Sequence, residues 1–460
     1  MYSRLARRHF SLSSLIASIF ARSSLFAIGL LAWSIGQAHA VPSFAQQTGL
    51  RCSACHVGGL GPQLTPFGRQ FKLEGYTMRE GKNFTLPLAG MVVASFVHTE
   101  KDQPSPPAAH YGVNDNFTLD QASIFVAGGV GNHFGGFSQF TYDGVGRSFA
   151  WDQLDLRATA RETIAGTSVL FGLSLNNSPG VQDVWNTLPS WGFPYTSSKL
   201  APAPAAATLM SGALAQRVLG ASAYAWWDSH FYTEAGVYWS PGRHFLSALG
   251  VDLADGGAVL KGGAPYVRAA YQKNFGRQNI EVGVFGLFAD LYPGDVRDAG
   301  ADKQRDFGVD ASWQLRGGGD NFFQLNARYI HERQNLSASF SLDQAANAHD
   351  TLQELHLDAS YYWHQRVGLT VSPFGIWGSR DRLLYAANRS LTPDSSGVIL
   401  QVDYTPWGTD VSPLGPRFNV RIGAQYTAYA RFDGGGTNYD GLGHNASDNN
   451  TFRLFTWFEF

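Results

Sequence analysis

The stretch RFNVRIGAQYTAYARF, residues 417–432, decides the fold class of this chain. From Phe418 to Phe432 nearly every second residue is apolar or aromatic, whereas the residues between them, such as Asn419, Arg421 and Gln425, are mostly polar. A period of two residues indicates a β-strand with one apolar face and one polar face. The segments 303–316 and 350–363 alternate in the same way. A soluble β-sandwich also alternates, so these strands alone leave the architecture open.

The spacing of the strands favours a barrel. Connections after odd-numbered segments are mostly long, whereas those after even-numbered segments are mostly tight, as at 317–320 and 364–365. Short turns on one side and long loops on the other are typical of bacterial outer-membrane barrels. We therefore predict an all-β fold, an antiparallel transmembrane β-barrel of about 16 strands over residues 84–460. The expected strands are 84–98, 117–128, 134–143, 149–161, 166–176, 212–227, 230–239, 264–273, 278–289, 303–316, 321–333, 350–363, 366–379, 396–406, 417–431 and 450–460.

The expected loops also predict the orientation of the barrel. The long connections are 99–116, 177–211, 240–263, 290–302, 334–349, 380–395 and 432–449. Because the long loops of such barrels face the cell exterior, the first strand is expected to start on the periplasmic side.

The last segment agrees with a closed barrel. Phe452, Leu454, Phe458 and Phe460 share one face, and the chain ends on this aromatic strand. As an ordinary edge strand of a soluble protein, such a surface would invite aggregation, and closure of a barrel removes that edge. A terminal strand of this kind resembles the signal read by the outer-membrane assembly machinery. We expect the chain to lie among the lipids of the outer membrane of a Gram-negative bacterium.

Composition narrows the classes of partner. The first 40 residues contain four Arg and no acidic residue, so the remainder of the chain holds 30 basic against 36 acidic residues. A nucleic acid partner requires a basic face, so this balance argues against one. Mean hydropathy is −0.15, which excludes a helical membrane protein.

The N-terminus predicts secretion. Basic residues are followed by an apolar run from Leu25 to Ile35 and then by Ala38-His39-Ala40, an A-x-A cleavage pattern. Residues 1–40 are therefore expected to be a signal peptide. The alternative is a membrane anchor, but the apolar run is too short for a hydrocarbon core of about 30 Å.

The two cysteines of the chain form a Cys-x-x-Cys-His motif at Cys52, Cys55 and His56. This pattern predicts covalent attachment of a c-type haem. The two thiols add across the vinyl groups on one edge of the porphyrin, and the following histidine ligates the iron as its proximal ligand. A chance match and a plain disulfide are the alternatives. We expect one haem c in a small, mainly helical or irregular segment over residues 41–83.

Residues near the motif suggest further contacts with the cofactor. Arg69 and Lys72 could pair with the haem propionates, or they could lie on a solvated helical face. The second iron ligand is open. Met78 is the first candidate, a histidine of the barrel interior is the rival, and Met78 could also serve only in packing.

The N-terminal segment resembles the fused monohaem cytochrome–porins of bacterial outer membranes, a family that includes the outer-membrane iron oxidases of iron-oxidising bacteria. The resemblance covers about 35 residues. It is carried by Pro42, Phe44-Ala45, Gln47-Thr48-Gly49, the haem motif, Pro62, Leu64, Phe67-Gly68-Arg69, Phe71-Lys72 and Gly75-Tyr76. It implies electron transfer across the outer membrane, from an extracellular donor such as Fe(II) to a periplasmic c-type cytochrome. Only Cys52, Cys55 and His56 carry over as functional residues, and an iron-oxidising activity does not follow automatically.

Three functions therefore stay open. The first is a redox conduit, because a haem fused to a barrel has little use unless electrons cross there. The second is a porin whose haem segment acts as a plug or gate, which the charged residues of the predicted lumen favour. The third is a haem-based sensor without net electron flow.

Overall fold

The computed structural model describes residues 42–81, 86–253, 257–415 and 418–460. The expected signal peptide, residues 1–40, and the expected junction at residues 83–84 lie outside the described residues. No helix within the described ranges is long and apolar enough to cross a membrane.

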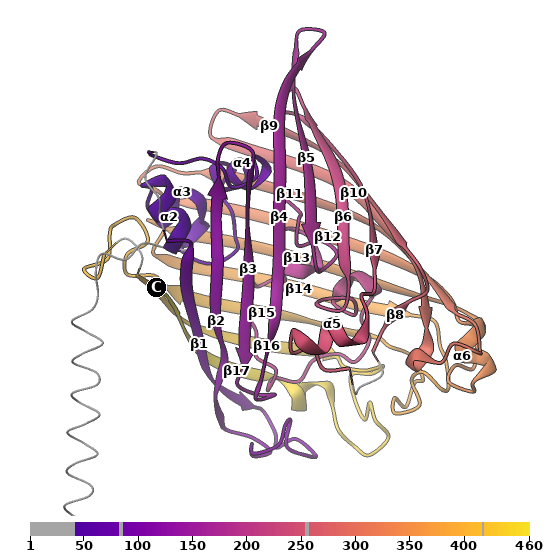
Figure 1. Cartoon of the computed structure of the whole chain (residues 1–460). Helices are drawn as coiled ribbons and strands as arrows, with labels where there is room; N and C mark the ends of the chain where they lie inside the picture. The colour runs from indigo at the N-terminus through magenta and orange to yellow at the C-terminus, as the bar shows by residue number, and fades with distance from the viewer. Residues whose placement is uncertain (1–41, 82–85, 254–256, 416–417) are drawn as a thin grey trace, which may run out of the picture.

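A single antiparallel sheet makes up most of the molecule (Figure 1). Within the described residues it contains seventeen strands, and pairing of β1 with β17 closes it into a barrel. One of the seventeen, β8, has only two residues and pairs with the end of β10, so sixteen strands form the wall. The predicted barrel of about sixteen strands is confirmed. The strands are β1 (Leu88–Thr99), β2 (Asn116–Val130), β3 (Phe134–Asp143), β4 (Ser148–Ile164), β5 (Thr167–Asn176), β6 (Leu219–Trp227), β7 (Phe231–Trp239), β8 (Val259–Leu260), β9 (Ala264–Phe275), β10 (Gln278–Tyr292), β11 (Asp302–Arg316), β12 (Phe322–Asn335), β13 (His349–Trp363), β14 (Val367–Gly378), β15 (Ser395–Tyr404), β16 (Asn419–Arg431) and β17 (Thr451–Glu459).

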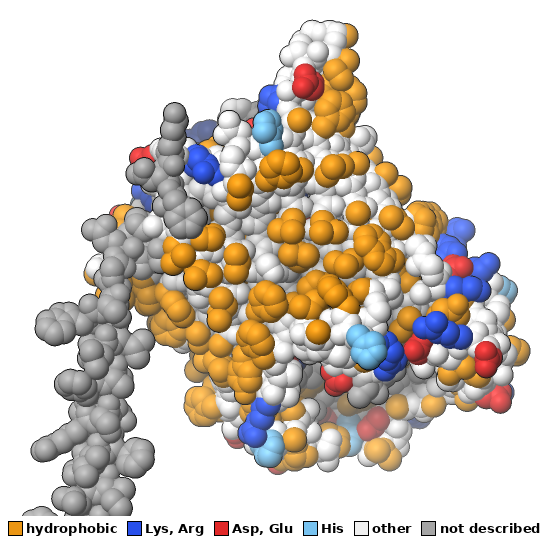
Figure 2. All heavy atoms as spheres, in the orientation of Figure 1, with side chains coloured by type: hydrophobic (Ala, Val, Ile, Leu, Met, Phe, Trp, Pro, Cys, Tyr) orange, Lys and Arg blue, Asp and Glu red, His pale blue; other side chains and the backbone are white. Residues whose placement is uncertain are grey.

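The outer face of the barrel is apolar, as the alternation predicts. On β11, Phe307 and Val309 are 45% and 48% exposed, whereas Asp310 on the opposite face of the strand is 3% exposed. Figure 2 shows hydrophobic side chains spread over the strands, with charged side chains gathered toward the two ends of the barrel. An apolar belt around a closed barrel is the surface that a lipid bilayer requires. The barrel is therefore a membrane-spanning one.

The two ends of the barrel differ. Turns of a few residues, such as 165–166 and 276–277, lie at one end, and the long connections at the other contain α5 (Arg243–Ala248) and α6 (Ser337–Ser341). The first helices of the chain lie beside the short-turn end (Figure 1). There Arg51 donates a hydrogen bond to the carbonyl oxygen of Thr409, in the connection between β15 and β16. In an outer-membrane barrel the short-turn end is periplasmic.

The lumen is filled by two parts of the chain. One is residues 42–81, here named the N-terminal segment, with α2 (Pro42–Thr48), α3 (Cys52–Cys55) and α4 (Pro66–Leu73). The other is residues 177–218 between β5 and β6, here named the inserted loop. Every residue from Asn177 to Leu188 is buried. Most charged residues on the polar faces of the strands are accordingly buried. His356 is half-buried, and Arg316 at the end of β11 is exposed. The buried ones include Asp155, Arg157, Arg268, Asp310, Arg328, Glu354, Asp358, Asp403 and Arg421.

The inserted loop corrects one strand boundary. The alternation predicts a strand from residue 212, but β6 begins at Leu219. Residues 212–218 continue the inserted loop, where Leu214 and Val218 join a buried apolar cluster with Leu188. Apolar residues in this stretch thus pack inside the lumen instead of facing lipid.

Candidate functional site

The Cys-x-x-Cys-His motif is shaped by one helical turn. The N–H of His56 donates to the carbonyl oxygen of Cys52 at 2.8 Å, which ends α3 after four residues. Residues three apart on a helix lie on one face, so both thiols point the same way. Neither cysteine is in a disulfide. The alternative of a Cys52–Cys55 disulfide is thus not what the structure contains.

The chain then folds back on the motif. His56 forms an isolated β-bridge with Leu64, and the N–H of Thr65 donates to the carbonyl oxygen of Cys55 at 2.9 Å. Thr65 caps α4 by accepting a hydrogen bond from the N–H of Gly68 at 3.2 Å. A Cβ at Gly68 would lie 2.2 Å from the carbonyl oxygen of Cys55, so only glycine allows α4 to approach the motif this closely.

Side chains in the lumen donate hydrogen bonds to the backbone carbonyl groups of residues 59–64. Asn419 donates to Gly59, Gln314 donates to Leu64 and Asn186 donates to Pro62, each at 2.7 Å. The first two donors come from the barrel wall and the third from the inserted loop. Buried carbonyl groups need such partners, and here residues far apart in the sequence supply them. The N-terminal segment is therefore fitted to this lumen.

A cavity of about 290 Å³ lies where the N-terminal segment meets the wall. This volume is at the lower end of small-molecule sites. Both cysteines and His56 line it. The remaining lining residues are Phe44, Ala45, Thr48, Leu50, Arg51, Gly61, Pro62, Leu64, Gly68, Phe71, Lys72 and Tyr76 of the N-terminal segment, Met91, Gln121, Phe125, Phe137, Gln139, Asp152, Gln153, Trp457 and Glu459 of the wall, and Asn186, Ser190, Trp191 and Tyr195 of the inserted loop.

The chemistry of the three donors fits a c-type haem. Burial raises the pKa of both thiols to about 12 and lowers the pKa of His56 to about 4. The imidazole is therefore neutral near pH 7 and keeps a lone pair for a metal ion. Its Nδ1 atom is buried and has no hydrogen-bond partner among the described residues. Two free thiols and one neutral imidazole on a mostly apolar cavity are what covalent attachment and proximal ligation of haem iron require.

The structure does not bring Met78 to this cavity. Its side chain packs beside the buried aromatic cluster of Phe71, Tyr76 and Phe137, and its carbonyl oxygen accepts a hydrogen bond from Gln47 at 2.7 Å. Among the described methionines, Met91 is the one that lines the cavity. It lies within a predicted strand, but the sequence alone gives no measure of its depth relative to the motif.

Arg69 and Lys72 hold α4 in the lumen. Arg69 donates to Asn279 Oδ1 at 2.8 Å and to Ser312 Oγ at 2.7 Å. Lys72 donates to the carbonyl oxygen of Val181 at 2.7 Å and to Asn186 Oδ1 at 2.8 Å. Both cations are buried, so the alternative of a solvated helical face is wrong. Their donors bind barrel and loop oxygens, although Lys72 also lines the cavity.

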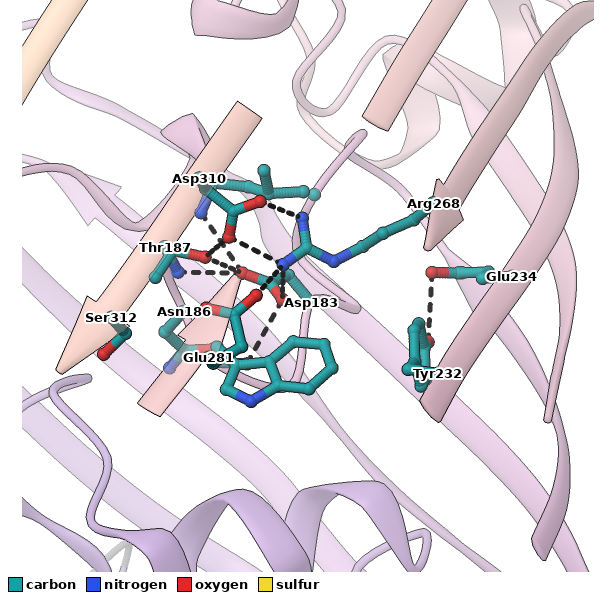
Figure 3. Close-up of polar contacts among 12 residues, drawn as sticks. Asp183, Asn186, Thr187, Tyr232, Glu234, Arg268, Glu281, Asp310 and Ser312 are labelled. Atoms are coloured by element: carbon teal, nitrogen blue, oxygen red, sulfur yellow. Dashed lines mark hydrogen bonds and ion pairs between the residues drawn. The ribbon is translucent and has the colours of Figure 1, made fainter. Parts of the chain in front are cut away.

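A buried ionic cluster anchors the inserted loop. Arg268 on β9 contacts Asp310 at 2.7 Å, Asp183 at 3.3 Å and Glu281 at 3.4 Å, and all four side chains are fully buried (Figure 3). Asp183 also accepts a hydrogen bond from the backbone N–H of Trp185. Burial by itself raises the pKa of the Asp183 carboxyl, but the positive charge of Arg268 outweighs it and holds that pKa below its usual range. The spacing of the strands predicts that residues 177–211 form an outward loop, which is wrong, because this segment folds into the lumen. The composition of this loop indicates burial, because a solvated loop rarely contains as many large apolar residues as Trp185, Leu188, Trp191 and Phe193.

The chain is similar in fold to solved structures of outer-membrane proteins. No protein-family model matches the chain, and no curated protein matches it significantly. Among solved structures the chain is similar to OprB of Pseudomonas putida, with 12% identity, a TM-score of 0.45 and coverage of 81% of this chain and 93% of that chain. It is similar to the channel DcaP of Acinetobacter baumannii, with 12% identity, a TM-score of 0.44 and coverage of 81% and 96%. It is also similar to an anion-selective porin from Comamonas acidovorans, with 12% identity, a TM-score of 0.41 and coverage of 81% and 98%.

The architecture of the barrel by itself identifies the class of membrane protein. Sixteen wall strands close through β1 and β17, an apolar belt faces outward, and short turns and long loops lie at opposite ends. These are the features of barrels that span bacterial outer membranes. The chain is a porin-like β-barrel protein of the Gram-negative outer membrane.

Proposed function

We propose that this protein holds one haem c, attached at Cys52 and Cys55 with His56 as an iron ligand, and moves electrons across the outer membrane. The observation that carries the proposal is that both thiols and the imidazole line one cavity inside the barrel. When bound, a haem supplies a one-electron redox couple whose potential the protein sets through ligands and burial.

The chain's own residues then do three things. The cysteines tether the group, and the neutral imidazole of His56 offers its lone pair to the iron. Arg69 and Lys72 fix the helix beside the motif. The closed wall separates the site from lipid, because lumen-facing and lipid-facing side chains alternate along every strand.

The motif lies near the periplasmic end of the barrel, where the neighbouring Arg51 contacts Thr409. A second depression of about 370 Å³ adjoins the motif and is lined by Arg51, Ser53 and Ala54 together with residues of the barrel's short-turn end, Arg316, Asp320, Gln365 and Thr409. This surface supports exchange of electrons with a periplasmic c-type cytochrome. The extracellular partner is a donor such as Fe(II), which the resemblance of the N-terminal segment to cytochrome–porins suggests.

The first test is an anaerobic visible spectrum of the purified, oxidised protein before and after addition of Fe(II), near neutral and at acidic pH. Prompt appearance of the sharp reduced c-haem bands supports an iron-oxidising conduit. Reduction by dithionite but not by Fe(II) keeps the haem and moves the search to other donors or to outward electron flow. The matched control is the double variant Cys52→Ala/Cys55→Ala, which should give no covalent haem. Absence of a c-type spectrum in the wild type refutes the proposal.

A second candidate is a porin closed by its N-terminal segment. The observation that favours it is the filled lumen, in which polar contacts hold the N-terminal segment inside a porin-like barrel. Single-channel recording separates the two functions. Stepwise opening of the wild-type barrel to ordinary porin conductance favours a gated pore, whereas a barrel that stays closed while its haem exchanges electrons favours the conduit.

A further inference from the structure

The cavity limits which side chains can provide a second iron ligand. Several polar residues that line it already have partners in the lumen. Lys72 donates to two oxygen atoms, Tyr76 donates to Asp155 Oδ2 at 2.7 Å, and Tyr195 accepts a hydrogen bond from Asn326 at 3.2 Å. Apart from His56, no described histidine lines the cavity. The soft donor that remains is the thioether of Met91.

Met91 lies at the depth of the motif. It is the fourth residue of β1, faces the lumen and is 6% exposed. In the register of the barrel it stands opposite Glu459 on β17, and both Glu459 and Trp457 line the same cavity. Cys52, Cys55 and His56 line this cavity as well, so the motif and this pair of strands share it.

The surroundings of Met91 suit a thioether ligand. Its side chain packs with Leu60, Val93, Phe455 and Trp457 in a buried apolar cluster, of which Leu60 belongs to the N-terminal segment. An apolar setting leaves the sulfur without competing hydrogen bonds. Methionine is an established partner of histidine on haem iron and raises the reduction potential.

We propose that Met91 of the barrel wall, and not Met78 of the N-terminal segment, is the second axial ligand of the haem iron. This inference rests on the proposed haem at Cys52, Cys55 and His56. One ligand then comes from the N-terminal segment and the other from the first strand of the barrel. The iron atom joins the two parts.

The test uses the full-length, haem-loaded protein and three variants, Met91→Leu, Met78→Leu and Met210→Leu. Met210 is buried in a different cluster, beside Leu188 and Leu209, and serves as the matched control. Exchange of Met for Leu conserves volume and is well tolerated in packed interiors, so all three barrels should fold, and heat-modifiable gel mobility verifies this. The readouts are the sulfur-to-iron charge-transfer band of the ferric protein and the reduction potential.

The expected result is that the wild type, Met78→Leu and Met210→Leu keep the band, whereas Met91→Leu loses it and has a lower reduction potential. A further variant, Met91→His, should replace the band by a spectrum of two-histidine ligation. Loss of the band in Met78→Leu, or an unchanged spectrum in Met91→Leu, overturns this assignment alone. A wild-type protein without covalent haem, measured by the pyridine haemochrome method, overturns the proposed function and this assignment together.

Discussion

Replacing Arg69 by methionine should release the N-terminal segment from the lumen far more often than in the wild type. Arg69 makes two charge-assisted hydrogen bonds, to Asn279 at 2.8 Å and to Ser312 at 2.7 Å, from a fully buried position. Hydrogen bonds to a charged group contribute about 1.5–3 kcal/mol each, so the docked state should lose about 3–6 kcal/mol. Because about 1.4 kcal/mol corresponds to a factor of ten, the undocked fraction should rise about 10²- to 10⁴-fold.

Limited proteolysis measures this fraction. Trypsin can cut after the buried Lys72 only when the segment has left the lumen, and cleavage tracks the open population when opening and closing are fast. The rate of this cut, followed by mass spectrometry, should rise by the same factor. Arg69→Lys keeps the charge but loses the planar fork that reaches two acceptors, so it should give an intermediate rate.

Arg161→Met is the matched control. Arg161 also contacts the N-terminal segment, at Glu74 Oε1 over 2.8 Å, but the two side chains are 43% and 29% exposed. A surface ion pair of this kind contributes about 0–1 kcal/mol, so the cleavage rate should change by about fivefold at most. A change below about tenfold in Arg69→Met, or an equal change in both variants, would refute the reasoning.

Three further predictions concern the loop, the charge of Lys72 and the close approach at Gly68. Arg268→Met leaves Asp183, Glu281 and Asp310 without their shared cation, at a cost of about 3–5 kcal/mol. The inserted loop should therefore loosen, and the single-channel conductance should rise. A conductance as low as that of the wild type would contradict this prediction. Burial lowers the pKa of Lys72 from 10.5 to about 7. Between these two pH values the undocked segment of the apoprotein binds the proton and the docked segment does not. Docking should therefore strengthen as the pH rises, by up to about 1.4 kcal/mol per pH unit. The ratio of cleavage rates after Arg69 in wild type and Lys72→Met should therefore fall as pH rises from neutral, and a flat ratio would contradict the lowered pKa of the buried Lys72 amine. Gly68→Ala places a Cβ 2.2 Å from the carbonyl oxygen of Cys55 and should lower the ratio of haem to protein. Gly81→Ala is the control, because its Cβ would meet no atom within 4 Å and should leave that ratio unchanged. Equal haem content in both variants would show that the close approach of α4 to the motif is unimportant.

The wall of the barrel could be predicted because each strand carries its own signal. Alternation around Phe307 and Asp310 depends only on neighbours in the chain, and closure follows from the aromatic strand that ends at Phe460. The contents of the lumen could not be predicted in this way. The burial of Arg69 depends on Asn279 and Ser312, which lie far away in the sequence.

The candidate site shows the same division. The motif at Cys52, Cys55 and His56 is local and readable, and the structure brings the three residues to one cavity. The expectation for Met78 used its distance along the chain, which does not report depth in the barrel. Met91 reaches the cavity because the register of β1 against β17 sets its level, and register is a property of the folded sheet.

The cavity has a further consequence because its wall includes both Met91 on the first strand and Trp457 on the last. Pairing of these two strands closes the sheet, so a molecule in which they are not paired has the cysteine motif but lacks one side of the pocket. The proposed haem would therefore find its complete cavity only in the closed barrel. On the proposal that a haem is attached at Cys52 and Cys55, its visible spectrum would then report whether the barrel has closed.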